Sequence, residues 1–301
     1  MIHRLIRPLM VTLAVIALTA CGSSNSSIAM SGSPGVDLGI AAPDGPARII
    51  SISTVATEIL FAIGAGDRVV AVDSQSNHPT EAPITDLSGF EPNVEAILGF
   101  QPDLVILSYD PGDVVASLEA AGVATLLQGA AYTIADTYSQ IKALGAATGD
   151  EDAADALVVD MRAEIADLVE SVEPREQPLS YYHELDDTLY TVTSSTFIGE
   201  VYTLAGLVNA ADQADADGSA WGYPQVSAEY LLDADPDLIF LADTRCCAQD
   251  AETVAARPGW ENLTAVETGR IVELDDDVAS RWGPRVVDFV RAIVNAVNAI
   301  D

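Results

Sequence analysis

Two segments far apart in the chain carry nearly the same pattern, and this repeat limits the fold more than any other feature. The first copy, residues 90–107, reads FEPNVEAILGFQPDLVIL, and the second, residues 221–241, reads WGYPQVSAEYLLDADPDLIFL. Each copy has a short helical stretch that ends before a proline, because proline and the residue before it disfavour helix. A run of four apolar residues follows, at 104–107 and at 238–241. Such runs are typical of strands buried on both faces of a parallel sheet.

The repeat extends towards the N-terminal side of each copy. The segments RIISISTVATEILFAIGAG and LYTVTSSTFIGEVYTLAGL both read as a strand, a turn rich in serine and threonine, and a helix closed by glycine. The match pairs Glu58 with Glu200, Gly66 with Gly206, Asn93 with Gln225 and Glu95 with Glu229. We therefore expect an α/β protein with two similar lobes, each built on a parallel sheet.

Residues 150–174 lie between the two halves and carry an apolar stripe with helical spacing. Acidic residues favour the N-terminal end of this helix, and Pro174 stops it. About 24 helical residues would span roughly 36 Å, enough for a rigid strut between lobes 47–149 and 175–301. A cleft between the lobes is where ligand sites commonly lie.

The N-terminal region has the pattern of a targeting segment. Residues 1–20 contain two arginines followed by a short apolar run, which predicts a secretory signal peptide. The ending Leu-Thr-Ala-Cys is similar to a bacterial lipobox, with Cys21 as the lipidated residue. Residues 21–46 are rich in Gly, Ser, Pro and Ala and read as a flexible tether. The alternative is an uncleaved membrane anchor.

The net charge of −33 over 301 residues excludes partners that are themselves polyanions. Such a chain is repelled by nucleic acid and by anionic membrane surfaces. Apart from Cys21, the cysteines are the adjacent Cys246 and Cys247. In an oxidising compartment they predict a vicinal disulfide, with free thiols or a ligand contact as alternatives. A zinc site lacks a second pair of ligands at suitable spacing, so we expect no metal site.

Taken in order, these segments resemble a known family. The lipobox, the tether, RIISISTVATEILFAIGAGDRVVAV, NVEAILGFQPDLVILS, the central helix and YPQVSAEYLLDADPDLIFLA are similar to substrate-binding lipoproteins of ABC importers, in the periplasmic-binding group for vitamin B12 and iron complexes. The resemblance covers about residues 47–300. It implies the class III fold, in which two Rossmann-like lobes with parallel sheets are bridged by one long α-helix. It also implies a monomer that performs no chemistry, holds no cofactor, and delivers a chelate to a permease dimer with its ATPase.

The resemblance assigns a role to two matched glutamates. In the family, each lobe presents a glutamate at the start of a surface helix, and the pair docks on arginines of the permease. The matching positions are Glu95 and Glu229. Charge pairing of this kind steers and registers docking. The alternative is that both residues only favour helix N-termini.

Aromatic residues supply the candidate ligand contacts. The segment WGYPQVS is similar to cobalamin-binding members, in which an aromatic residue before PQVS packs on the corrin, and this predicts contacts from Trp221 and Tyr223. Flat chelates suit aromatic walls. Further candidates near strand ends or helix starts are Phe90, Tyr109, Tyr132 and Trp282. For each of them, core packing is the alternative.

Three arginines complete the candidate site. Arg245, Arg281 and Arg285 could bind carboxylates or catecholates of a ferric siderophore, or a corrinoid phosphate, or else form salt bridges. Because a siderophore site collects more basic groups than this chain offers, a corrinoid is favoured. Haem is the third choice, with His183, Tyr181 or Tyr182 as iron ligands.

Other classes of protein fit less well. Ser194 and Ser195 lie near His183 and Asp186 in the sequence, which would suit a hydrolase, but no G-x-S-x-G elbow is present. G-x-G-x-x-G and P-loop motifs are also missing. A zinc or manganese importer would need more histidines than His78 and His183. A purely structural lipoprotein would not need a repeated glutamate.

Overall fold

The computed structural model describes residues 45–300. The predicted signal peptide, the predicted lipidation site Cys21 and nearly all of the predicted tether lie outside these residues. None of the helices described is both long and apolar enough to span a membrane. The described residues belong to one compact unit.

The first half forms a five-stranded sheet in which every pairing is parallel, with the order β3-β2-β1-β4-β5. Its strands are β1 (Ile49–Ile52), β2 (Val69–Asp73), β3 (Ile84–Leu87), β4 (Leu104–Leu107) and β5 (Ala124–Leu127). The helices of this half are α1 (Thr54–Ala62), α2 (Val94–Gly99), α3 (Val114–Ala120) and α4 (Ile134–Thr148), with a 3-10 turn η1 (Gly66–Arg68). Every residue of β1 and β4 is buried, as the continuous apolar run 104–107 predicts.

The second half forms a four-stranded parallel sheet with the order β7-β6-β8-β9. Its strands are β6 (Ser180–Glu184), β7 (Val208–Asn209), β8 (Leu238–Leu241) and β9 (Ile271–Glu273). Its helices are α6 (Phe197–Leu204), α7 (Ala228–Ala234), α8 (Ala251–Ala255), α9 (Thr264–Glu267), α10 (Asp276–Ser280) and α11 (Val286–Asn298), with 3-10 turns η2 (Asp212–Asp215) and η3 (Trp260–Asn262). The predicted class of two parallel-sheet α/β lobes is confirmed.

The helix caps show which residues of the two copies are equivalent. Asn93 caps α2 and Ser227 caps α7, each through its side chain. The pairing of Asn93 with Gln225 was therefore wrong by two residues, whereas Glu95 and Glu229 do occupy equivalent positions. The sequence match slipped because the first copy has an extra residue before its proline and a shorter stretch after it.

The Pro-Asp pairs that follow these helices have a structural role. The carboxylate of Asp103 accepts the Arg48 amide at 2.9 Å, and that of Asp237 accepts the Ser180 amide at 2.7 Å. Each aspartate thus ties the turn before the second central strand to the start of the first. The repeated Pro-Asp stretch is explained by this anchoring of neighbouring strands.

The ends of α1 and α6 follow the predicted pattern with one correction. Gly64 follows α1 at φ +84°, and Gly206 follows α6 at φ +75°. Residues in this left-handed conformation favour glycine and commonly terminate helices. The residue equivalent to Gly206 is therefore Gly64, and Gly66 instead begins the turn η1.

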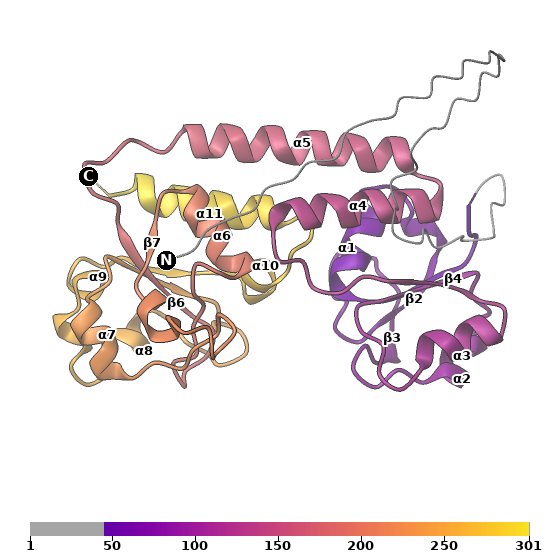
Figure 1. The fold of residues 1–301 in the computed structure, drawn as a ribbon, viewed down its shortest axis with the longest axis horizontal. Helices are drawn as coiled ribbons and strands as arrows, with labels where there is room; N and C mark the ends of the chain where they lie inside the picture. Colours follow the sequence, from indigo (N-terminus) through magenta and orange to yellow (C-terminus); the bar gives the residue numbers. More distant parts are fainter. Residues whose placement is uncertain (1–44, 301) are drawn as a thin grey trace, which may run out of the picture. The chain divides into compact units, whose positions relative to one another are not determined.

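Helix α5 (Glu151–Glu170) follows the first sheet in the chain and packs against both α4 and α11 (Figure 1). It is shorter than the predicted 150–174, because Ser171 closes it before Pro174 is reached. Its buried residues Ala154, Val158, Met161 and Ile165 follow the expected stripe. The division of the chain at 47–149, 150–174 and 175–301 stays a prediction.

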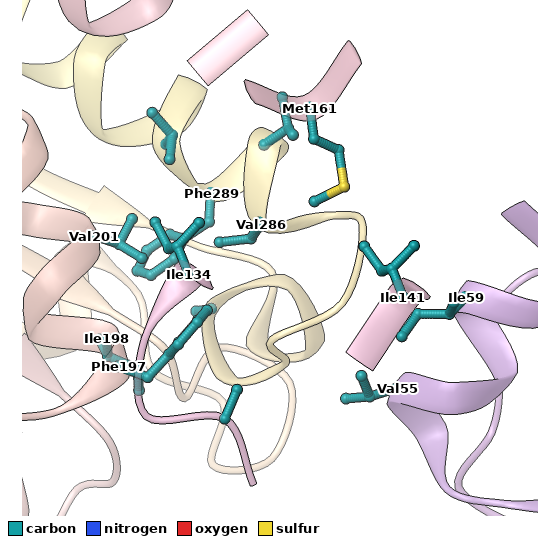
Figure 2. Close-up of a cluster of buried hydrophobic side chains, with 14 of the residues drawn as sticks. Val55, Ile59, Ile134, Ile141, Met161, Phe197, Ile198, Val201, Val286 and Phe289 are labelled. Carbon is teal, nitrogen blue, oxygen red and sulfur yellow. The ribbon is translucent and has the colours of Figure 1, made fainter. Parts of the chain in front are cut away.

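One hydrophobic core connects helices from both halves. It includes Ile59 of α1, Ile141 of α4, Met161 of α5, Val201 of α6 and Phe289 of α11. Figure 2 shows these side chains gathered from the different helices. Smaller cores lie on the other faces of the two sheets.

Candidate ligand-binding site

The predicted ligand contacts of the first half all lie in the loops that follow strands of its sheet. Phe90 follows β3, Tyr109 follows β4 and Tyr132 follows β5. In open parallel sheets, ligands bind outside the carboxyl ends of the strands. The topology therefore brings these three aromatic residues to the same edge of the sheet.

A cavity of about 570 Å³ opens at this edge and is lined by residues from both halves. Among the predicted site residues, Phe90, Tyr109, Arg281 and Trp282 line it. The lining also contains polar residues that were missed, namely Ser53, Thr54, Asp73, Gln75, Ser108, Asp277 and Ser280. The position of Asp73 as the last residue of β2 was a signal that could have found it. A cavity of about 360 Å³ beside Pro174 and Arg175 contains none of the predicted residues.

The remaining aromatic candidates are exposed but do not line this cavity. Trp221 is 89% exposed and Tyr132 78%, and Phe90 of the cavity lining is 80% exposed. These values exclude core packing as their role. Tyr223 is 45% exposed; burial and then the neighbouring Tyr132 raise the pKa of its hydroxyl. Tyr132 and Tyr223 therefore lie near each other although they belong to different halves. Tyr190, also partly exposed and bridged to Gln225, was missed because its strand pairing was not predicted.

The loop that carries Trp221 is held in an unusual conformation. Asp215 accepts the amides of Ala220 and Gly222, each at 2.7 Å. Trp221 itself has φ +56°, a conformation that costs energy for a bulky residue. A Cβ on Gly222 would meet the Thr196 methyl at 2.6 Å, so only glycine fits there. These contacts thus hold the loop so that the indole ring lies in solvent.

Arg281 and Arg285 converge on one buried carboxylate. Glu58 of α1 is 3% exposed and receives two hydrogen bonds from Arg285, at 2.6 and 3.0 Å, and one from Arg281, at 3.1 Å. Arg285 lines a separate hollow of about 250 Å³ together with Glu58. The salt-bridge alternative considered for these arginines is therefore the arrangement observed. Glu58 was missed because its partners lie more than two hundred residues away.

Arg245 and the two cysteines lie in a loop fixed by acidic residues. The Asp276 carboxylate accepts the amides of Arg245 and Cys246, and Arg245 pairs with Asp277 at 3.1 Å. Cys246 and Cys247 are free thiols in the structure, so the vicinal disulfide is absent from it. Burial and the neighbouring Cys247 raise the pKa of the Cys246 thiol to about 12. The Cys246 amide donates to the Asp276 carboxylate, and the Cys247 amide donates to the Asp243 carbonyl. These hydrogen bonds oppose the backbone distortion that a disulfide between adjacent cysteines requires.

The residues considered for iron ligation lie in the core. His183 is fully buried, its Nδ1 contacts the Tyr202 hydroxyl at 2.8 Å, and burial lowers its pKa to about 3. Tyr181 and Tyr182 are also buried, so none of the three reaches a ligand in this structure. Within residues 45–300, no group of three or more His, Cys, Asp and Glu side chains is placed to hold a metal ion.

The serines considered for hydrolysis have structural partners. Ser194 donates to Asp212 at 2.8 Å, and Ser195 pairs with Thr193 at 2.8 Å. Neither serine is hydrogen-bonded to His183, whose Nδ1 contacts the Tyr202 hydroxyl and whose buried Nε2 has no hydrogen-bond partner among the described residues. The arrangement therefore lacks a nucleophile next to a base.

A second buried charge cluster lies beneath the cysteine loop. Arg257 makes two hydrogen bonds to Glu184, at 2.6 and 2.7 Å, and lies over the Trp260 ring. Asp243 is fully buried, and neither of its carboxylate oxygens has a hydrogen-bond partner among the described residues. Burial and the neighbouring Glu184 carboxylate raise the pKa of Asp243 to about 7.

Glu95 and Glu229 are exposed in the first turns of α2 and α7. Neither forms an ion pair within residues 45–300. Both carboxylates are therefore available to a partner, and both also favour the N-terminus of their helix.

Comparison with known proteins places this geometry in a family. The family model described as "Periplasmic binding protein" matches residues 49–278. The uncharacterised ABC transporter substrate-binding lipoprotein YvrC of Bacillus subtilis is 30% identical over 261 residues, which covers 84% of this chain and 80% of the relative. A cobalamin-binding protein of Halobacterium salinarum is 30% identical over 260 residues, covering 83% and 69%.

A solved structure supports the same fold. The periplasmic haem-binding protein RhuT of Roseiflexus superposes with a TM-score of 0.70 at 25% identity, covering 84% of this chain and all of that one. With two parallel-sheet lobes, a cavity at their strand ends and this extent of similarity, the chain belongs to the periplasmic binding protein family, whose members are extracytoplasmic solute-binding components of ABC importers and not enzymes.

Proposed function

We propose that the protein captures a corrinoid, of the cobalamin type, and delivers it to an ABC importer. The observation that carries this proposal is a set of exposed aromatic rings. Phe90 and Tyr109 line the cavity at the strand ends, and Tyr132, Trp221 and Tyr223 are exposed outside its lining. Exposed rings of this size stabilise a flat, largely apolar chelate by burying its faces. The similarity to a cobalamin-binding protein supports the same ligand class.

The charges of the site also favour a ligand of low net charge. Arg245, Arg281 and Arg285 are each paired with carboxylates. An anionic siderophore would therefore have to compete with Glu58 and Asp277 for these guanidinium groups. A corrinoid with amide side chains needs no such displacement.

The partner and the anchor complete the proposal. We infer that Glu95 and Glu229 dock on a two-fold permease served by an ATPase, because they occupy equivalent, exposed positions on the two lobes. Lipid on Cys21 would hold the protein, as a monomer, at the outer face of the cell membrane.

The test is a calorimetric titration of protein lacking residues 1–21 with cyanocobalamin, in parallel with haemin and a ferric tris-catecholate. We expect sub-micromolar binding of cyanocobalamin and much weaker binding of the two iron chelates. Tight binding of haemin or the catecholate without cobalamin binding would overturn the corrinoid assignment and leave the importer role intact.

A further inference from the structure

The guanidinium of Arg281 lines the 570 Å³ cavity, yet its terminal donors are already used. Its Nη1 donates to Glu58 at 3.1 Å and to the Asn77 side chain at 2.9 Å. Its Nη2 donates to the Gln75 carbonyl at 3.2 Å and to Asp277 at 2.7 Å. Four terminal N–H groups meet four protein acceptors, so the group has no terminal donor left for a ligand anion.

The two carboxylates that hold Arg281 are fixed in turn by other residues. Glu58 is clamped by the bidentate contact from Arg285. The second carboxylate oxygen of Asp277, Oδ2, accepts hydrogen bonds from the Asn77 side chain at 2.9 Å and from Arg245 at 3.1 Å. Such charge-assisted contacts orient both carboxylates, and they oppose rotation of either one away from Arg281.

The local charge balance is therefore not that of an anion site. The ionisable side chains in the cavity lining are Asp73, Asp277, Arg281 and Tyr109. The positive charge of Arg281 is matched by Asp277 within the lining and by Glu58 behind it. A carboxylate on a ligand would meet acidic groups at close range and would gain no unpaired cation.

We propose that Glu58 and Asp277 are specificity-determining residues, which make the cavity discriminate against anionic chelates by saturating Arg281. Glu58 acts through Arg281 and is a positioning residue, whereas Asp277 lines the cavity itself. The inference rests on the proposed capture of a metal chelate. The new element is that two acidic residues, and not a shortage of arginine, set the preference of the cavity for ligands of low negative charge.

The experiment compares two corrinoids of one shape, cyanocobalamin and its monocarboxylate, in which one side-chain amide is replaced by a carboxylate. The ratio of their dissociation constants is measured for the wild-type protein and for the Asp277→Asn and Glu58→Gln variants. Asp288→Asn is the matched control. Asp288 and Glu164 both form ion pairs with Arg291. This arrangement resembles the pairing of Arg281 with Asp277 and Glu58. Arg291 lies on α11 and does not line the cavity.

We expect the wild-type protein to bind the monocarboxylate more weakly than cyanocobalamin. In the Asp277→Asn variant the ratio should fall by about three- to tenfold, as expected for the loss of one negative charge near the ligand. Glu58→Gln should act in the same direction, and Asp288→Asn should leave the ratio unchanged. If Glu58→Gln does not fold, the Asp277→Asn result decides alone.

An unchanged ratio in the Asp277→Asn variant would overturn the inference while the proposed function stands. If the wild-type protein binds no corrinoid, the proposed function fails, and the same ratio is measured for haemin against its neutral dimethyl ester. A fall of that ratio in the Asp277→Asn variant would support the charge rule, and an unchanged ratio would reject it.

Discussion

At the scale of single residues, the strained loop around Trp221 holds the indole ring in an exposed position. Asp215 fixes the loop through two amide contacts, and Trp221 adopts φ +56° at 89% exposure. A residue held in an unfavourable conformation with no packing in return is typical of a binding position.

We expect Trp221→Ala and Tyr223→Ala each to weaken cyanocobalamin binding by about tenfold or more, because each removes aromatic surface that would cover the ligand. Thermal stability should change little in Trp221→Ala, since the ring buries almost nothing in the free protein. Calorimetric titration measures the effect, with Val159→Ala on the exposed side of α5 as the control. Equal affinity in both aromatic variants would exclude the Trp221 loop from the site.

The buried Asp243 gives a prediction about pH. An unfolded aspartate titrates near pH 3.9, whereas burial and Glu184 raise the folded pKa to about 7. Between about pH 4 and pH 7 the folded state therefore binds more protons than the unfolded state, and this group lowers the free energy of unfolding as pH rises.

The Asp243→Asn variant should lack this decrease in the free energy of unfolding. Its stability relative to wild type should increase from about pH 4 to about pH 7 and stay constant above, as measured by denaturant unfolding at a series of pH values. Asp187→Asn at an exposed position serves as the control and should show no trend. A difference between Asp243→Asn and wild type that does not vary with pH would mean that Asp243 is ionised throughout.

At the scale of elements, the short helices α2 and α7 occupy matching places in the two lobes and carry matching glutamates. Both helices have side-chain N-caps, from Asn93 and Ser227. Because those caps already satisfy N-terminal amides, the glutamates are not needed to start the helices.

We expect the double variant Glu95→Ala/Glu229→Ala to lower importer-dependent uptake by about tenfold or more while ligand affinity stays the same, because the carboxylates lie outside the cavity lining. Uptake into cells and calorimetric affinity are measured separately. Glu151→Ala, which removes a first-turn glutamate from α5, controls for the effect on helix N-termini. Normal uptake by the double variant would disprove docking through this pair.

At the scale of the whole described unit, the shared core makes the two lobes depend on each other. Met161 of α5 is 3% exposed and belongs to the same core as α1 and α11 residues (Figure 2). Ion pairs from Glu58 to Arg281 and Arg285 add a polar connection between the halves. A common core favours unfolding as one cooperative unit.

We expect Met161→Ala to lower the free energy of unfolding by about 2–5 kcal/mol, through lost burial and a cavity. Val159→Ala, on the same helix at 63% exposure, should cost less than about 0.5 kcal/mol. Denaturant unfolding followed by far-UV circular dichroism and tryptophan fluorescence should give coincident transitions. Two separated transitions would show that the lobes unfold independently.

The sequence by itself determined the class of fold and the family. Apolar runs such as 104–107 and 238–241 are buried on both faces, and their repetition at matching places requires two similar parallel-sheet lobes. These signals are local, since each lies within a few residues of the chain. The exposed aromatic candidates Phe90, Tyr109 and Tyr132 could also be placed, because they lie in the loops that follow strands.

Only the tertiary structure decided which partners the charged side chains of the site bind. Arg281 looked available to a ligand in the sequence, yet Glu58 of the other lobe and Asp277 saturate it. His183 was considered as a haem-iron ligand, and the fold buries it against Tyr202. The physical reason is that a side chain's partners are chosen by packing between elements distant in the chain, and no local pattern records that choice.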